Sequence, residues 1–167
     1  MDSVFRLIEE SAPSTWIRES VSLFAFPGIL ILHTLGMAML AGAAVAMSLR
    51  ALGVAPGVPR QAMTRFMPFA WAGLGINALS GVLLVVGYPA KALTNPIFYA
   101  KLLLIGAAVI ATMRLCQALG ALASSEPDKF VTRRRVLAMS VIALWAATIT
   151  AGRLLPYTYT RLLSAVS

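Results

Sequence analysis

The chain has 167 residues, of which 59% are hydrophobic and only 12% are charged. An average soluble domain is about 45–50% apolar and about 25% charged, so this composition excludes an ordinary soluble globule, a disordered chain and a nucleic-acid-binding module. The net charge of +8 comes from 14 basic and 6 acidic residues. One cysteine excludes an internal disulfide, and one histidine excludes a multi-histidine metal site within one chain.

Residues 1–19 are predicted to form an amphipathic segment that lies on the membrane surface. Apolar and charged residues alternate at helical spacing through the first ten positions, a pattern typical of interfacial helices. Pro13 is expected to end this helix, and Ser14 or Thr15 to cap a second short helix that contains Trp16. Because acidic residues recur and no apolar core of the required length is present, we expect no cleavable signal peptide here.

Residues 20–156 are predicted to form four membrane-spanning helices, each of which needs about 20 mainly apolar residues. Three stretches without any Asp, Glu, Lys or Arg carry this prediction: residues 20–49, 66–90 and 136–152. The four helices are expected at about 21–49, 66–88, 97–123 and 136–155. The third is less uniform, because it carries Lys101 and Arg114. Residues 157–167 are expected to form a short C-terminal tail.

The connections between these helices are short, so sequential helices should be antiparallel neighbours. The sequence Gly87-Tyr88-Pro89 is expected to stop the second helix. Asn95 followed by Pro96 is typical of an N-cap with proline at the first helical position. The chain is therefore predicted to be an all-α polytopic membrane protein, an up-down bundle of four transmembrane helices.

The Lys and Arg residues of the short loops predict the orientation. The loops that follow the first and third helices hold these basic residues: Arg50, Arg60, Arg65, Lys129, Arg133, Arg134 and Arg135. The opposite side has fewer of them and most of the acids, so we place both termini outside, in the periplasm, and the chain in a bacterial inner membrane. The cluster Lys129, Arg133, Arg134 and Arg135 is also expected to contact anionic lipid headgroups.

Polar side chains deep in a membrane are costly and usually face the interior of a bundle. The predicted spans put such residues near the helix centres, with Arg114 about 6 Å towards the cytoplasm at 1.5 Å per residue. The expected polar layer consists of His33, Asn77, Ser80, Arg114 and Thr148. Gly73, Asn77 and Gly81 form one stripe that lets another helix approach. Helix packing is the simpler interpretation of this layer, and a ligand or proton site is the alternative.

His33 admits several interpretations. The simplest is a structural histidine that is hydrogen-bonded inside the bundle. Alternatively, His33 with Met37 and Asn77 could contact haem b or a quinone. Haem would then need a second axial ligand from a methionine, a partner subunit or the symmetry mate of a homodimer. His33 with Met37 could also hold a copper(I) ion as a metal site.

The residues that are absent also restrict the function. There is no P-loop, no HExxH motif and no convincing catalytic triad, and no Asp or Glu falls within a predicted span. Proton-driven transporters usually rely on an intramembrane acid, so transport is disfavoured. Lys101 lies about one turn inside the third helix, where snorkelling towards the surface is the simplest interpretation.

Two stretches carry a resemblance: residues 27–50, with the sequence PGILILHTLGM at their start, and residues 87–104, which include ALTNPIFYAKLLL. With the four-span layout they resemble an uncharacterised family of small bacterial integral membrane proteins. That family is distantly similar to the four-helix part of copper-resistance D membrane proteins and to cytochrome-b-like bundles. The resemblance covers roughly residues 12–160 and implies His33 and Lys101 as positions of interest. It does not imply haem, because cytochrome-b-like proteins carry several histidines.

Together these observations favour a small, non-catalytic integral membrane subunit that is an anchoring or electron-exchanging partner of a membrane redox assembly. One alternative is a stand-alone haem b or quinone-binding electron-transfer protein that uses His33. Another is a copper or small-solute permease. The expected partners are the lipid bilayer and other membrane subunits or a second copy of the chain, and no nucleic acid.

Overall fold

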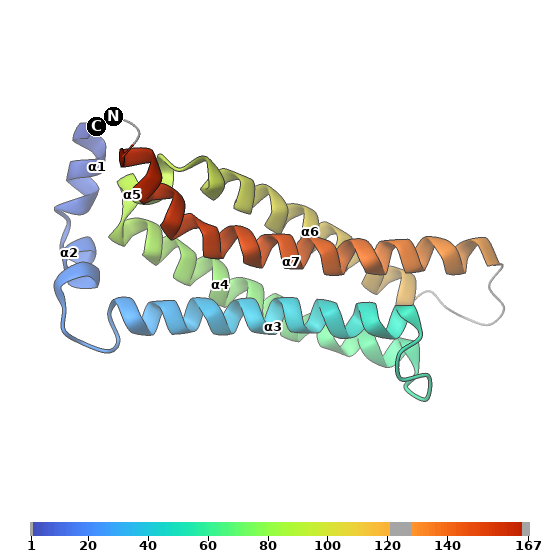
Figure 1. Cartoon of the computed structure of the whole chain (residues 1–167). Coiled ribbons are helices and arrows are strands. Elements are labelled where there is room, and N and C mark those ends of the chain that lie inside the picture. The colour runs from blue at the N-terminus through green and yellow to red at the C-terminus, as the bar shows by residue number, and fades with distance from the viewer. Residues whose placement is uncertain (1, 121–127, 165–167) are drawn as a thin grey trace.

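The computed structural model describes residues 2–120 and 128–164, and within these ranges the chain is helical and contains no strand. The elements in chain order are α1 (Asp2–Glu9), α2 (Ala12–Glu19), α3 (Phe26–Leu52), the 3-10 helix η1 (Arg60–Phe66), α4 (Met67–Gly87), α5 (Pro89–Leu93), α6 (Pro96–Gly120) and α7 (Asp128–Ser164). Figure 1 shows α3 and α7 running along the length of the bundle, with α4 and α6 inclined to them. We call the end that carries α1, α2 and α5 the terminal end, and the opposite end the loop end.

Among the residues that the structure describes, four helices are long and apolar enough to cross a membrane. They are Phe26–Leu52, Ala62–Gly87, Pro96–Gly120 and Val131–Leu155. The predicted all-α bundle with four spanning helices is thus confirmed, and the chain is a multi-pass membrane protein. The helix α3 packs along α4 and α7, and α6 packs along α7.

The first spanning helix begins at Phe26, not near Val21 as predicted. Pro27 lies in the first turn of α3, where its missing N–H costs nothing. A helix that began at Val21 would have placed the ring of Pro27 against the carbonyl of Leu23. The approach of Leu23 to Gly28 instead marks a tight entry, because a Cβ on Gly28 would lie 2.7 Å from the Leu23 oxygen.

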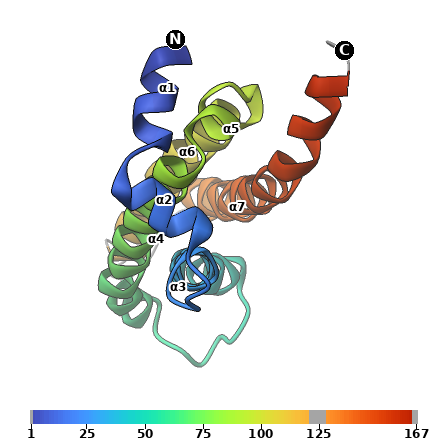
Figure 2. The same ribbon diagram turned by 90° about the vertical axis from the view of Figure 1, so that its left-hand side faces the viewer.

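The last helix is longer than predicted at both ends, since α7 runs from Asp128 to Ser164. The charge-free stretch limits the apolar span but not the helix, because Arg and Lys are good helix formers. Residues 157–164, expected as a tail, are helical. Pro156 lies within α7, and Figure 2 shows the final turns of α7 bending away from the bundle. A proline inside a helix removes one hydrogen bond and bends the chain in this way. For the third helix, the predicted end at residue 123 lies outside the described residues.

The N-terminal helices α1 and α2 lie across the terminal end of the bundle, not along its axis (Figure 1). Pro13 does not end the first helix as expected, because it lies in the first turn of α2, a position that favours proline. Ile17 is buried against the end of α4, where a Cβ on Gly87 would lie 2.8 Å from Ile17 Cγ2. The segment is therefore fixed to the bundle through α2.

Asn95 caps α6 as predicted, since its Oδ1 accepts the backbone N–H of Ile97 at 3.0 Å. Its Nδ2 donates to Thr158 Oγ1 at 3.0 Å and faces the Leu155 oxygen at 3.3 Å. The start of α6 is thereby tied to the bent part of α7. The short helix α5, which the sequence did not predict, fills the turn between α4 and α6.

Large apolar side chains fill the loop half of the bundle. The fully buried ones include Met47, Leu115, Leu119, Val141 and Trp145. Trp145 Nε1 donates to Thr112 Oγ1 at 3.1 Å, so its polar atom is satisfied inside the core. Between this core and the terminal half, Gly36 and Gly73 bring α3 and α4 into backbone contact. A Cβ on Gly73 would lie 2.8 Å from the Gly36 oxygen.

Candidate functional site

His33 is held by α4 through its ring. Its Nδ1 lies 3.1 Å from Ser80 Oγ. The Ser80 hydroxyl donates to the Ile76 oxygen at 2.6 Å, so its proton is already used and Oγ accepts the Nδ1–H of His33. The lone pair of the imidazole is therefore on Nε2. A Cβ on Gly81 would lie 3.4 Å from His33 Cε1, so this glycine makes room for the ring.

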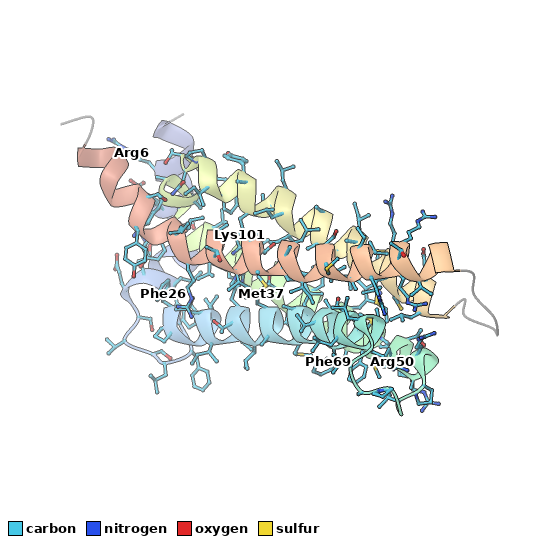
Figure 3. All side chains as sticks on the ribbon, turned by 45° about the vertical axis from the view of Figure 1, so that its right-hand side comes forward. Arg6, Phe26, Met37, Arg50, Phe69 and Lys101 are labelled. Carbon is cyan, nitrogen blue, oxygen red and sulfur yellow. The ribbon has the colours of Figure 1, made fainter. Side chains whose placement is uncertain are left out.

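Lys101 reaches the other ring nitrogen from α6. Its Nζ lies 3.4 Å from His33 Nε2, which accepts the hydrogen bond in this tautomer. Both side chains are half-buried. The lysine stem passes Gly152 of α7, where a Cβ would lie 3.6 Å from Lys101 Cε. In Figure 3, Lys101 lies beside α7 at a level between Phe26 and Met37. Lys101 thus points to His33 inside the bundle and does not snorkel as expected.

Asn77 belongs to the same region but acts on the backbone. Its Nδ2 donates to the His33 carbonyl oxygen at 2.8 Å, and the side chain is buried. This bond joins α4 to α3 one turn from Ser80. Asn77 therefore fixes the position of His33, while Ser80 fixes the orientation of its ring.

The site lies in the terminal half of the bundle, not at the helix centres where the sequence placed it. His33 follows the start of α3 at Phe26 by seven residues, which is about 10 Å at 1.5 Å per residue. Lys101 follows the start of α6 at Pro96 by five residues, or about 7.5 Å. The later start of α3 and its extension to Leu52 account for the difference at His33.

The other members of the expected polar layer are not hydrogen-bonded to this group. Thr148 is buried one turn from Gly152 on α7, but its hydroxyl donates to the Leu144 oxygen at 2.8 Å within its own helix. Arg114 is exposed, because 13 residues of helix turn it about 140° away from Lys101. Met37, considered as a haem or copper ligand, packs against the apolar core. The layer is therefore a compact group formed by His33, Ser80, Asn77 and Lys101.

The basic cluster at the loop end is divided by the structure. Arg133 and Arg135 are exposed, as headgroup contacts require. Arg134 is only 5% exposed and faces the protein. The side chain of Lys129 lies outside the described residues. Arg50 donates to the backbone oxygens of Val58 and Pro56 and so holds the first loop.

The chemistry of the site is that of a hydrogen-bond donor with no acid beside it. No Asp or Glu occurs between residues 20 and 125 or after residue 128. Lys101 has three N–H donors, and His33 takes one. Among the described residues, the other two have no hydrogen-bond acceptor. The arrangement thus suits a carbonyl or other acceptor oxygen inside the bundle.

Metal ligation fits this arrangement poorly. Among the described residues, no group of three or more His, Cys, Asp and Glu side chains could hold a metal ion. A haem iron would need the lone pair of His33 Nε2, which faces Lys101 Nζ. Lys101 would have to leave before the iron could approach, so we derive no function through haem.

No family model, curated protein or solved structure matches this chain. The function is therefore inferred from the geometry and the composition of the site.

Proposed function

We propose that the protein is a small, non-catalytic integral membrane subunit that binds a quinone headgroup at the His33–Lys101 pair and anchors a membrane redox assembly there. The observation that carries the proposal is the inward position of Lys101, whose Nζ lies 3.4 Å from His33 Nε2. A lysine that only needed to reach the membrane surface would point the other way.

Placing Lys101 within a membrane span costs free energy. Ionisable residues within a membrane span are expensive, face the bundle interior and mark functional sites. Here the lysine has no carboxylate in the spans to pair with. A quinone carbonyl supplies the missing acceptor, and a hydrogen bond from an ammonium group is stronger than one between neutral groups. Quinones dissolve in the bilayer, so the ligand reaches the site through lipid.

The setting that we propose is the inner membrane of a bacterium, with both termini in the periplasm. Exposed arginines at the loop end, such as Arg65, Arg133 and Arg135, support a cytoplasmic position for that end. The quinone site would then lie in the periplasmic half of the membrane. The partners would be other membrane subunits or a second copy. We also propose the distant relationship to copper-resistance D proteins, because the two resembling stretches contribute His33 and Lys101 to one site.

The test is calorimetric titration of the purified protein in lipid nanodiscs with 2,3-dimethoxy-5-methyl-1,4-benzoquinone, a headgroup without a tail. Lys101→Met should weaken binding at least about tenfold, since a hydrogen bond to a charged group contributes about 1.5–3 kcal/mol. Arg114→Met removes a cation from the exposed face of the same helix and should leave binding unchanged. Equal affinities of the wild type and Lys101→Met, or no binding above empty nanodiscs, would contradict the proposal.

A further inference from the structure

The linker between α2 and α3, residues 20–25, presents its large apolar side chains to the outside of the protein. Val21 is fully exposed, and Leu23 and Phe24 keep 78% and 82% of their surface accessible. Figure 1 shows this linker at the level of the first turn of α3, turned away from α7. Exposed apolar surface that is contiguous in this way marks a site of contact with another protein or with a membrane.

The linker has a defined shape, because its own serines bind its backbone. The backbone N–H of Ser22 donates to Ser20 Oγ, and that of Phe24 donates to Ser22 Oγ, both at 3.2 Å. The N–H of Ala25 donates to the Ser22 oxygen at 3.1 Å, and Ala25 is fully buried. Because lipid offers no partner to a backbone N–H, these internal bonds suit a segment with apolar surroundings.

The length of α3 places the linker at the membrane boundary. Arg50, near the other end of α3, follows Phe26 by 24 residues, which is about 36 Å at 1.5 Å per residue. The hydrocarbon core of a bilayer is about 30 Å thick. With Arg50 among the headgroups at the loop end, Phe26 and the linker before it lie in the interface at the terminal end. At this depth apolar side chains reach the acyl chains while the irregular backbone stays in the polar boundary.

We infer that residues 20–25 form a membrane anchor whose three exposed apolar side chains insert into the lipid leaflet at the terminal end. The linker carries no Asp, Glu, Lys or Arg. It leads directly into the outer face of α3, where Leu30 and Ile31 are exposed. Because α3 is one of the spanning helices, the lipid that surrounds this face also surrounds the linker. The anchor fixes the depth of the terminal end in the membrane, independently of any quinone.

A partner subunit is the competing occupant of this patch. Interfaces between proteins surround an apolar core with polar groups that form hydrogen bonds across the contact. In the linker, both serine hydroxyl oxygens already accept bonds from the linker backbone. The linker thus offers its surroundings mainly apolar surface, which is what acyl chains require. Its composition and its depth therefore favour lipid.

Spin labelling tests the inference on the full chain in lipid nanodiscs. A Cys116→Ser background leaves each introduced cysteine as the only one. The measured quantity is the collision rate with dissolved oxygen, which concentrates in lipid, relative to that with a water-soluble nickel chelate. We expect this ratio to be several-fold higher for labels at Leu23→Cys and Phe24→Cys than at Gly57→Cys. Gly57 is the aqueous control, because it is exposed in the loop after α3 and a Cβ there would meet no atom within 4 Å.

Leu35→Cys provides the lipid standard, since Leu35 is 54% exposed on the outer face of α3. A ratio for the two linker labels that approaches that of Leu35 supports the anchor. Linker labels that are as accessible to the nickel chelate as Gly57 would place the linker in water. That result would overturn the inference and leave the patch to a partner protein.

A further pair of variants tests whether the serines allow the linker to enter the boundary. Ser20→Ala combined with Ser22→Ala removes the two hydroxyl acceptors, and the nickel accessibility of the Phe24 label should then rise. Ser140→Ala is the matched control, because it removes an exposed hydroxyl that is bonded within α7. An accessibility that responds equally to both changes, or to neither, would overturn the role of these serines in the anchor.

Discussion

The same four helices enclose two different interiors, one in the loop half and one in the terminal half of the bundle. In the loop half, large side chains such as Met47, Leu115 and Trp145 fill the interior, and the indole N–H of Trp145 is bonded to Thr112. In the terminal half, Gly81 and Gly152 leave space that polar side chains occupy. The contrast indicates that the loop half supplies stability, while the terminal half holds a site that a purely stable bundle would not contain.

The largest expected effect is in the loop half. Trp145→Ala removes a side chain with only 1% of its surface exposed, and we expect the free energy of unfolding in mixed micelles to fall by about 3–5 kcal/mol. Trp71→Ala is the control, since Trp71 is 47% exposed on α4. Similar losses of unfolding free energy for the two variants would contradict a compact core in the loop half.

The contact between the two halves should be the next most sensitive. Gly73→Val places a side chain where a Cβ would already lie 2.8 Å from the Leu40 nitrogen. Overpacking of this kind costs about 1–3 kcal/mol, and here the neighbours are backbone atoms, which cannot rotate away. Thermal unfolding should therefore shift strongly. Gly75→Val tests the same helix at a position with no atom within 4 Å, and a shift of equal size there would contradict the close approach of α3 and α4.

Smaller losses are expected within the polar site. Asn77→Ala removes the hydrogen bond to the His33 oxygen, and such bonds between membrane helices average about 0.6 kcal/mol with a maximum near about 1.7 kcal/mol. We expect a loss in this range, measured by reversible unfolding in mixed micelles. Thr150→Ala, which removes a hydroxyl bonded only within its own helix, provides the comparison. If Asn77→Ala lowered the free energy of unfolding more than Trp145→Ala does, the loop half would not be the main source of stability.

Lys101→Met should weaken quinone binding without lowering the stability of the bundle. An ionisable group within a membrane span is costly, so replacing the half-buried Lys101 by an apolar side chain of similar length removes that cost. We therefore expect the unfolding free energy to stay constant or to rise by about 1 kcal/mol, while quinone binding weakens. A large loss of stability would mean that Lys101 stabilises the fold. It would contradict the assignment of the terminal half as a binding site.

The sequence predicted the architecture well because apolar spans without charge are a strong signal. It also predicted the Asn95 cap from the Asn-Pro pair. It missed the helical nature of residues 157–164, because the charge-free stretch on which the prediction depended ends at residue 152. It missed Pro13 in the first turn of α2 for the related reason that proline both starts and stops helices.

The site itself could be predicted only in part. The sequence identified three polar residues within the predicted spans, His33, Asn77 and Ser80. It did not predict the contact between His33 and Lys101. The sequence did contain an indication of this contact. His33 and Lys101 each follow, by a few residues, the start of a helix at the terminal end, so they lie at a similar depth in the membrane. The direction of the Lys101 side chain depends on how α6 packs against α7, where the lysine stem passes Gly152, and a local sequence pattern does not encode this packing.

The central claim is that His33 donates its Nδ1–H to Ser80 and presents Nε2 to Lys101. Because His33 is the only histidine of the chain, ¹⁵N-histidine labelling gives one pair of ring nitrogen resonances in nanodiscs. We expect one protonated nitrogen, perturbed by Ser80→Ala, and one unprotonated nitrogen, whose resonance shifts in Lys101→Met but not in Arg114→Met. A proton on Nε2, or resonances that ignore Lys101→Met, would contradict it.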